Sequence, residues 1–394
     1  MKNIEQKEKN ILFLLHCSDL NNGATRSMVD VIENLVKKEN VKIIVIYPDK
    51  EGSAIKYLND LGIKTFHILY GRWDYFQNQK MLNKTKFLIK SIIKQAIGII
   101  NIPKVINIIK RERINVLYSN TGVIYQGALL NKITKIPHIW HIREFGEEDH
   151  GLKNMYGNNR FYKCLNKYTN SVIFISNSIK QKFEKYIENK NKTSVIYNDI
   201  SKKFINPKEN INENYKLKMT IVGTIQEGKG QFEAVKAVKI LKDKNIDCEL
   251  HMAGKETGDY YLEIKKYITE NGLEKNAIFD GFIKNVNEYR KKFDIGIVAS
   301  SNEAFGRVTI EGMLSGLAMI GADAAGTKEL IEDNNNGLLY ELHNEKALAD
   351  KIQILNNDRQ MLKNISNNGF NYAVNNFTVG KASDAIYNIV KDII

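Results

Sequence analysis

The chain has 394 residues, of which 43% are hydrophobic and 26% charged, a globular balance that excludes wholesale disorder and predicts two or three domains. Its three cysteines, Cys17, Cys164 and Cys248, are odd in number and far apart, which argues against a disulfide framework and a paired-cysteine metal site. The first residues are polar, and no run approaches the roughly 20 apolar residues that span a bilayer. We therefore expect a cytoplasmic protein.

The net charge of +13 is confined to the first half of the chain. Residues 1–200 contain 32 of the 58 Lys and Arg and 18 of the 45 Asp and Glu, whereas residues 201–394 are close to neutral. This asymmetry predicts that the first half meets an anionic partner, namely nucleic acid, an anionic membrane leaflet or a phosphorylated substrate. The alternative, surface lysines without a role, does not explain why one half alone is basic.

Short β-rich apolar runs alternate with longer amphipathic stretches, a pattern typical of βαβ units and parallel sheets. In the first half we expect strands at 10–16, 41–47, 64–69, 115–119, 138–142, 171–175 and 193–197, with helices such as 25–38 and 177–187. The polar segment 198–214 is predicted to be a linker. In the second half we expect strands at 217–222, 247–253, 277–280, 294–298, 318–321 and 337–340. The predicted fold is α/β, with two doubly wound, Rossmann-like parallel-sheet domains facing a central cleft.

One segment of the first half, residues 80–113, departs from this alternation. Apolar residues at three- and four-residue steps with lysines between them predict a basic amphipathic helix, interrupted near Pro103. Such helices bind anionic lipid surfaces; packing on its own domain with solvated lysines is the alternative. A single acid, Glu112, stands against the bases Lys80, Lys84, Lys86, Lys90, Lys94, Lys104, Lys110, Arg111 and Arg113.

Two motifs of the second half carry groups suited to a phosphorylated sugar. After the strand at 294–298 come Glu303, then Gly306 at the start of a helix, then Glu311 within that helix. Free N–H groups at the helix start suit a phosphate or sugar oxygen, and the two carboxylates can accept hydroxyl protons. The run IVGTIQEGKG at 221–230 places Lys229 in a loop before a helix, which resembles a phosphate cradle. It is neither a Walker loop nor a dinucleotide fingerprint, which disfavours ATPase and NAD-dependent chemistry.

Two further motifs belong to the first half. The loop 19–24 follows the first strand, and Gly23 at the entry to a helix can present N–H groups to a diphosphate. In the strand at 138–142, His138 and His141 stand three apart, hence on opposite faces, which argues against a shared metal. His141, Arg143 and Glu144 fall at the carboxyl end of that strand, where a ligand is expected.

Together these motifs resemble glycosyltransferase family 4, the retaining nucleotide-sugar glycosyltransferases of the GT-B fold. The resemblance is strongest over 219–343, where the run from Glu303 to Tyr340 is similar to the family's two-glutamate region almost without a gap. It implies an acceptor domain at 1–200, a donor domain at 201–376, and a C-terminal helix, 377–394, that crosses back to the first domain. It also implies that Glu303, His141 and Lys229 are catalytic.

The resemblance assigns further roles. Glu303 would hold hydroxyls of the donor sugar, Glu311 the ribose hydroxyls, and Lys229 the leaving diphosphate, without a metal or cofactor and with retention of anomeric configuration. Arg143 and Glu144 would meet the acceptor or the diphosphate. Thr224 stands where the family usually has arginine, so either Arg143 or Arg307 would compensate or the donor would bind in a slightly different position. Ala318 stands where the family often has proline. The implied donor-binding set, for a UDP- or GDP-linked sugar, is Gly23, Ala24, Gly223, Thr224, Lys229, Phe282, Ile283, Glu303, Ala304, Phe305, Gly306, Arg307 and Glu311.

The leading hypothesis is therefore a retaining glycosyltransferase of bacterial surface-glycan synthesis, acting on a lipid-linked or polymeric acceptor at the inner face of the cell membrane, through peripheral contact with anionic lipid. A nucleotide-sugar epimerase of similar architecture is the alternative within enzymes, although the region from Glu303 to Glu311 disfavours it. A basic nucleic-acid-binding protein is the alternative from another class. No RRM, KH or helix-turn-helix signature is found in the sequence, so we expect no nucleic-acid partner.

Overall fold

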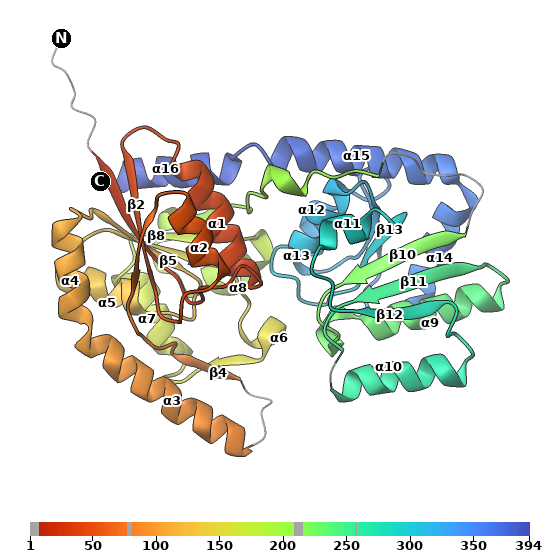
Figure 1. The fold of residues 1–394 in the computed structure, drawn as a ribbon, viewed down its shortest axis with the longest axis horizontal. Coiled ribbons are helices and arrows are strands. Elements are labelled where there is room, and N and C mark those ends of the chain that lie inside the picture. Colours follow the sequence, from red (N-terminus) through yellow and green to blue (C-terminus); the bar gives the residue numbers. More distant parts are fainter. Residues whose placement is uncertain (1–7, 77–80, 209–215, 257) are drawn as a thin grey trace, which may run out of the picture. The chain divides into compact units, whose positions relative to one another are not determined.

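Two parallel sheets organise the chain, one in each of two units (Figure 1). The computed structural model describes residues 8–76, 81–208, 216–256 and 258–394, without the side chains of 81–84 and 150. Unit 1 consists of residues 1–199 and 380–394, and unit 2 of residues 200–379. Both are built from strands alternating with helices, which confirms the predicted α/β fold with two Rossmann-like domains. Lys80 and residues 209–214 of the expected linker lie outside the described residues.

The main sheet of unit 1 is parallel throughout, in the order β3-β2-β1-β5-β6-β8-β9. Successive residues of its central strand β1 face opposite sides: Ile11 and Phe13 pack into one hydrophobic cluster, Leu12 and Leu14 into the other. Both faces of the sheet are therefore buried. The strands are β1 (Lys9–Leu14), β2 (Val41–Tyr47), β3 (Lys64–His67), β5 (Val116–Asn120), β6 (His138–Ile142), β8 (Ser171–Phe174) and β9 (Thr193–Val195).

Helices cover the two faces of this sheet. Helices α1, α2 and α16 supply buried residues to the first cluster, and α4 and α5 to the second. Helix α16 lies beside α1, and the carboxylate of Asp199 accepts hydrogen bonds from the N–H groups of Ala382 and Ser383, both 3.0 Å, at the start of α16. This carboxylate fastens the end of the chain to unit 1. The helices are α1 (Gly23–Leu35), α2 (Ser53–Asp60), α3 (Met81–Ile100), α4 (Ile102–Arg111), α5 (Gln126–Thr134), α6 (Glu147–His150), α7 (Asn158–Lys167), α8 (Asn177–Glu184) and α16 (Lys381–Ile393).

The basic segment forms two helices rather than one. Helix α3 ends at Ile100 and α4 begins at Ile102, with an angle of 46° between them. Pro103 lies in the first turn of α4, where its missing N–H leaves no helix bond unmade. Within the described residues no single helix is long and apolar enough to cross a bilayer; the α3–α4 pair reaches that composition together, across its bend.

Two short strands were not predicted. Strands β4 (Asp74–Phe76) and β7 (Leu152–Asn154) pair antiparallel beside α3. Each has three residues, too few for an alternating pattern to show in the sequence. They bring the chain segment after β3 next to the one after β6.

The sheet of unit 2 is also parallel, in the order β12-β11-β10-β13-β14-β15. Its core is formed with α9, α10, α14 and α15. The strands are β10 (Leu217–Val222), β11 (Cys248–Ala253), β12 (Ala277–Gly281), β13 (Ile295–Val298), β14 (Ala318–Ala322) and β15 (Leu338–Tyr340). The helices are α9 (Gln231–Asp243), α10 (Asp259–Glu270), α11 (Val286–Arg290), α12 (Arg307–Leu314), α13 (Ala325–Leu330), α14 (Glu345–Asn357) and α15 (Arg359–Phe377).

Candidate active site

Two neighbouring strands of unit 2, β10 and β13, deliver an ion pair to the carboxyl edge of the sheet. The loop after β10 carries Lys229 and the loop after β13 carries Glu303, and Nζ of the lysine lies 2.7 Å from Oε2 of the carboxylate. The N–H of Ser301 donates to the carbonyl of Gly228 at 3.3 Å, which ties the two loops together through their backbones. Both charged side chains are partly exposed, 31% and 15%, so the pair is open to a ligand.

Two glycines set the path of these loops. Gly230 has φ +68°, and a Cβ there would stand 2.3 Å from the carbonyl oxygen of Ala299. Gly306 has φ +95° and immediately precedes α12, whose first N–H groups are left without helical acceptors. Glycine therefore allows the close approach to Ala299 at residue 230 and the positive φ before α12 at residue 306.

Helix α12 presents Glu311, whose carboxylate is held by two arginines. Nη2 of Arg290 donates to Oε2 at 2.9 Å and Nε of Arg307 to Oε1 at 2.7 Å. Burial alone would raise the pKa of Glu311, but the two cations outweigh it and lower that pKa below its usual value. Glu311 is therefore an ionised acceptor in a fixed orientation, and each oxygen keeps a lone pair for a hydroxyl donor.

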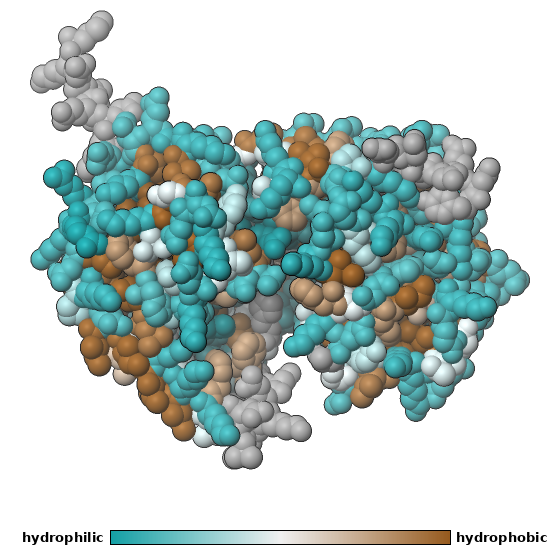
Figure 2. Space-filling view, viewed as in Figure 1, coloured by the Kyte–Doolittle hydropathy of each residue, from teal (hydrophilic) through white to brown (hydrophobic). Residues whose placement is uncertain are grey.

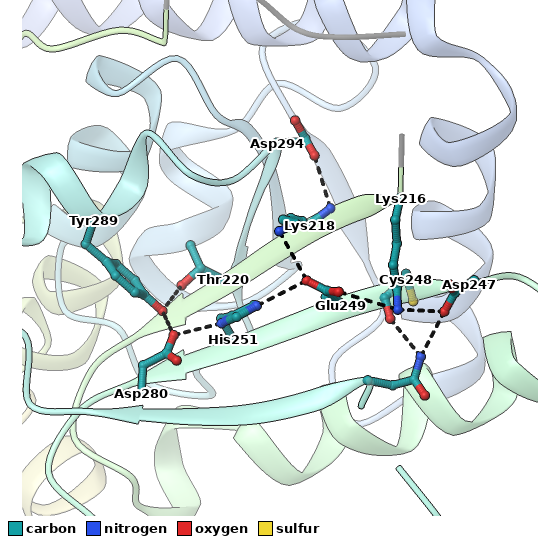
Figure 3. Close-up of polar contacts among 11 residues, drawn as sticks. Lys216, Lys218, Thr220, Asp247, Cys248, Glu249, His251, Asp280, Tyr289 and Asp294 are labelled. Carbon is teal, nitrogen blue, oxygen red and sulfur yellow. Dashed lines mark hydrogen bonds and ion pairs between the residues drawn. The ribbon is translucent and has the colours of Figure 1, made fainter. Parts of the chain in front are cut away.

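Arg290 is positioned by its neighbour in α11, Tyr289. The hydroxyl of Tyr289 donates to Asp280 of β12 at 2.6 Å, and Nδ1 of His251 lies 2.9 Å from the same carboxylate oxygen (Figure 3). The network continues along this face of the sheet from His251 to Glu249. Fixing α11 to β12 in this way fixes Arg290, and through it the carboxylate of Glu311. No local sequence pattern points to Arg290, which lies 21 residues before Glu311 in the chain.

The other expected donor residues of unit 2 lie around these groups in different ways. Phe282, directly after β12, is 71% exposed, so its ring is open to stacking. Phe305 is instead buried against Phe377, with ring centroids 5.9 Å apart, so its ring is not open to a ligand. Thr224 is exposed, while Gly223, Ile283 and Ala304 are half-buried.

In unit 1, the carboxyl edge gathers residues from the adjacent strands β1, β5 and β6. At the end of β6, Nδ1 of His141 lies 2.7 Å from the hydroxyl of Tyr118 and 3.1 Å from Nη2 of Arg143. Because a guanidinium can only donate, Nδ1 is an acceptor and the imidazole proton resides on Nε2. Burial, reinforced by the Arg143 cation, holds the pKa of His141 well below its usual range, so the ring is neutral. Buried Nε2 has no hydrogen-bond partner among the described residues, which leaves it a donor for a ligand.

Glu144 is a second unusual group at this edge. It accepts from the N–H of Gly122 at 2.6 Å, and burial, with the nearby carboxylate of Asp149, raises the pKa of Glu144 to about 7. Thr121, before that glycine, has φ +94°, a strained value for a β-branched residue. The carbonyl of His141 accepts from the N–H of Thr121 at 2.9 Å, which helps hold this backbone in place.

Gly23 and Ala24 begin α1, after the N-cap Asn22. A Cβ at Gly23 would meet no described atom within 4 Å, so packing does not require this glycine. The carbonyl of Ala24 accepts from Asn120 at 3.1 Å, while the side chain of Arg143 donates to Asn120 and Asn198. The guanidinium of Arg143 is thus engaged in hydrogen bonds within unit 1.

The structure therefore brings the expected residues together as two sets, one at the carboxyl edge of each sheet. Unit 2 gathers Lys229, Glu303, Gly306, Arg307 and Glu311; unit 1 gathers Gly23, Ala24, His141, Arg143 and Glu144. Sequence reasoning missed the side chains that orient them, Tyr118, Asn120, Asn198, Tyr289 and Arg290. Throughout the described part of the chain, no group of three His, Cys, Asp or Glu residues has the arrangement of a metal site.

Known glycosyltransferases resemble this chain in sequence. Residues 201–372, within unit 2, match the family described as glycosyl transferases group 1. A glycosyltransferase of Methanocaldococcus jannaschii is 29% identical over 80% of this chain and 86% of its own length. A Campylobacter jejuni enzyme named as an N-acetylgalactosaminyltransferase acting on a diphospho-undecaprenol-linked sugar is 28% identical over 64% of this chain and 72% of its own length.

Solved glycosyltransferase structures share the fold. A glycosyltransferase of Rickettsia africae has a TM-score of 0.78 at 20% identity, covering 98% of this chain and 99% of that one. The HepE protein of Anabaena, solved with UDP-glucose, has a TM-score of 0.75 at 21% identity, covering 97% and 99%. Its two parallel-sheet units have the GT-B fold, and its sequence relatives are glycosyltransferases, which supports the GT-B glycosyltransferase superfamily.

Proposed function

We propose that this protein is a retaining, metal-independent glycosyltransferase, similar to family 4, that moves a sugar from a nucleoside-diphosphate sugar to a lipid-linked or polymeric acceptor. The observation that carries the proposal is the set Lys229, Glu303 and Glu311 at one sheet edge, beside the N-terminus of α12. These groups match the parts of such a donor: an anionic diphosphate, sugar hydroxyls and ribose hydroxyls.

In this proposal the leaving diphosphate is stabilised by a small set of groups. Arg290 and Arg307 are both committed to Glu311, and Thr224 brings no charge, so Lys229 is the cation that meets the diphosphate. The free N–H groups at the start of α12 add their partial positive charge. Donor binding then exchanges the lysine's contact with Glu303 for one with phosphate, which frees Glu303 to accept a hydroxyl of the sugar.

Unit 1 supplies the acceptor side. In this proposal neutral His141 donates from Nε2 to a sugar hydroxyl or to the acceptor, and the pKa of Glu144 near neutrality suits a proton acceptor for an acceptor hydroxyl. The activity printed for the C. jejuni relative, on a diphospho-undecaprenol-linked sugar, supports a lipid-linked acceptor. A Staphylococcus aureus relative named for capsular polysaccharide biosynthesis supports a role in surface glycans.

The orientation of α3 supports peripheral contact with an anionic membrane. The side of α3 that faces its own unit carries small or polar residues. Ser91 and Gln95 are buried, and a Cβ at Gly98 would stand 3.0 Å from Cβ of Tyr70. Figure 2 shows an apolar strip along α3. Its exposed isoleucines are Ile89 at 54%, Ile92 at 52%, Ile93 at 53%, Ile99 at 57% and Ile100 at 74%.

The charges around this strip are suited to an anionic leaflet. Lys86 and Lys90 are exposed and make no ion pair with the described residues, whereas Lys94 pairs loosely with Asp49 at 3.6 Å. The one acid of the segment, Glu112, is buried among Lys42, Lys64 and Arg111 and adds no exposed negative charge. We therefore extend the proposal to location: the enzyme works in the cytoplasm at the inner face of the cell membrane, with this face of unit 1 on the lipid.

A thermal-shift panel of UDP- and GDP-linked sugars tests the proposed donor class. A donor present at about 100 times its Kd stabilises the fold by about 2.7 kcal/mol. Glu311→Gln, which removes a charged acceptor while keeping its shape, should abolish the shift, whereas Glu345→Gln at the start of α14 should preserve it. Absence of a shift with every donor would overturn the assignment. The anomeric configuration of the product, read by NMR, then tests retention.

A further inference from the structure

A groove of about 850 Å³ opens in unit 1 between α3, α5 and α7, away from the residues assigned above. Its volume is in the range of small-molecule sites. Its walls are largely apolar, and α3 contributes through the exposed face described for the membrane contact. The apolar lining includes Trp73, Ile92, Ala96, Ile99, Tyr125 and Leu129.

Cations stand at the α5 and α7 side of this groove. Lys132 of α5 and Arg160 and Lys163 of α7 line it, are exposed, and make no ion pair with the described residues. All three act on the thiol of Cys164, where burial raises the pKa and the three cations oppose that rise. Three cations therefore line one side of a largely apolar groove, which suits an amphiphile with a strongly anionic head.

The groove also adjoins the candidate active site of unit 1. Trp73 lines both this groove and a smaller cavity of about 320 Å³, whose wall includes Glu144 and Gly122. The indole of Trp73 is fixed by a hydrogen bond from Nε1 to the carbonyl of Gly122 at 2.8 Å and by stacking on Tyr125, with centroids 5.4 Å apart. Trp73 is therefore a common wall of the groove and of the cavity that includes Glu144.

We infer that this groove binds the chain of a polyisoprenyl diphosphate acceptor, with the diphosphate held by Lys132, Arg160 and Lys163 and the attached glycan directed past Trp73 toward Glu144. The inference rests on the proposed function, since it names the acceptor of the same reaction. Its apolar wall is continuous with the isoleucine face of α3, so the chain reaches the groove directly from the lipid surface. The named substrate of the C. jejuni relative has the same chemistry.

Cys164 lines the groove and is partly exposed, so its alkylation reports on occupancy. The full-length protein is treated with N-ethylmaleimide, and alkylation is followed site by site by peptide mass spectrometry with Cys17 as internal reference. Farnesyl diphosphate, at about ten times its Kd, should slow the reaction of Cys164 about tenfold. Inorganic diphosphate and farnesol, tested separately, should slow it far less.

Variants locate the effect, each compared with and without farnesyl diphosphate. Ala96→Trp, at an exposed position of α3, fills the apolar wall, and Arg160→Glu with Lys163→Glu reverses the charge; both should remove the protection. Lys56→Glu, an exposed lysine on α2, should retain it. Unprotected Cys164 in the wild type, equal protection by inorganic diphosphate, or protection that survives Ala96→Trp would each overturn the inference.

This test is independent of the donor panel. Stabilisation by a nucleotide sugar without protection of Cys164 would refute the inference about the groove and leave the proposed function intact. Protection of Cys164 without stabilisation by any nucleotide sugar would support lipid binding in the groove and refute the proposed nucleotide-sugar donor.

Discussion

Nζ of Lys229 and Oε2 of Glu303 lie 2.7 Å apart, although the two residues belong to loops that follow different strands. The pair places a cation and an acceptor side by side at the sheet edge, where a diphosphate and its sugar would require both. An exposed pair of this kind contributes little to stability, about 0–1 kcal/mol. Its position is therefore better explained by ligand binding than by folding.

Removing the hydroxyl of Tyr289 should impair donor binding without touching the donor. In Tyr289→Phe, α11 loses its 2.6 Å bond to Asp280, so Arg290 holds Glu311 less firmly. We expect the KM for the donor to rise several-fold, kcat to change little, and stability to fall by about 1 kcal/mol. Tyr57→Phe, which removes a 3.0 Å bond to Glu33 in unit 1, should cost similar stability and leave KM unchanged. A fall in kcat at constant KM would contradict this positioning role.

Glu144 should make the stability of the protein decrease as pH rises toward neutrality. Its pKa is raised from 4.5 to about 7 in the folded state, so the folded protein binds the extra proton between those values and loses that advantage as pH increases through them. Glu144→Gln, which resembles the protonated form, should therefore raise the melting temperature at pH 8 relative to wild type and change it little at pH 4. Glu147→Gln, at an exposed neighbour, serves as control. An equal effect at both pH values would show that the carboxyl does not titrate as described.

Turnover should survive an excess of EDTA. In the proposed mechanism the diphosphate is stabilised by Lys229 and by the N-terminus of α12, and the carboxylate of Glu311 is already neutralised by Arg290 and Arg307. Initial rates with and without EDTA, after prior dialysis against the chelator, provide the measurement. Loss of activity that added Mg²⁺ or Mn²⁺ restores would refute metal independence.

Binding to anionic vesicles should depend on the exposed face of α3. The combined variant Lys86→Gln, Lys90→Gln, Ile89→Ser, Ile93→Ser removes two cations, each contributing about 1 kcal/mol near an anionic leaflet, together with part of the apolar strip. Co-sedimentation with phosphatidylserine vesicles at low salt should fall sharply, and donor binding should be unchanged.

The matched control for this variant is Lys265→Gln with Leu262→Ser on α10. These residues are likewise exposed on a helix, with Leu262 at 59%, but belong to unit 2. The control should sediment like wild type. Wild-type protein that stays in the supernatant at low salt would end the membrane proposal.

The sequence predicted the strands well because buried parallel strands are continuous apolar runs. Residues 41–47, 138–142 and 217–222 form strands with the expected bounds. The break in the basic segment was expected near Pro103 and occurs at residue 101, because proline is tolerated in the first turn of a helix. Strands β4 and β7 were missed, since three residues carry no period.

The site was predictable only where its residues follow strands. Lys229, Glu303 and His141 could be placed at sheet edges because each follows or ends an apolar run. Arg290 could not, because its contact with Glu311 depends on how α11 packs on the sheet. The exposure of the apolar face of α3 to solvent could not be predicted either. Periodicity identifies an apolar stripe but does not say whether the stripe faces the unit or the solvent.

Turnover of the donor by Lys229→Ala and Glu303→Gln tests the central claim most directly. Each variant removes one member of the 2.7 Å pair, and each should retain the wild-type circular dichroism spectrum because the pair is partly exposed. We predict that both lower the rate by about 100-fold or more, the usual cost of losing an electrostatic stabiliser. Lys239→Ala, which breaks a 2.6 Å surface pair with Asp243 in α9, should behave as wild type. Folded Lys229→Ala or Glu303→Gln protein with near-normal turnover would contradict the assignment of this sheet edge as the active site.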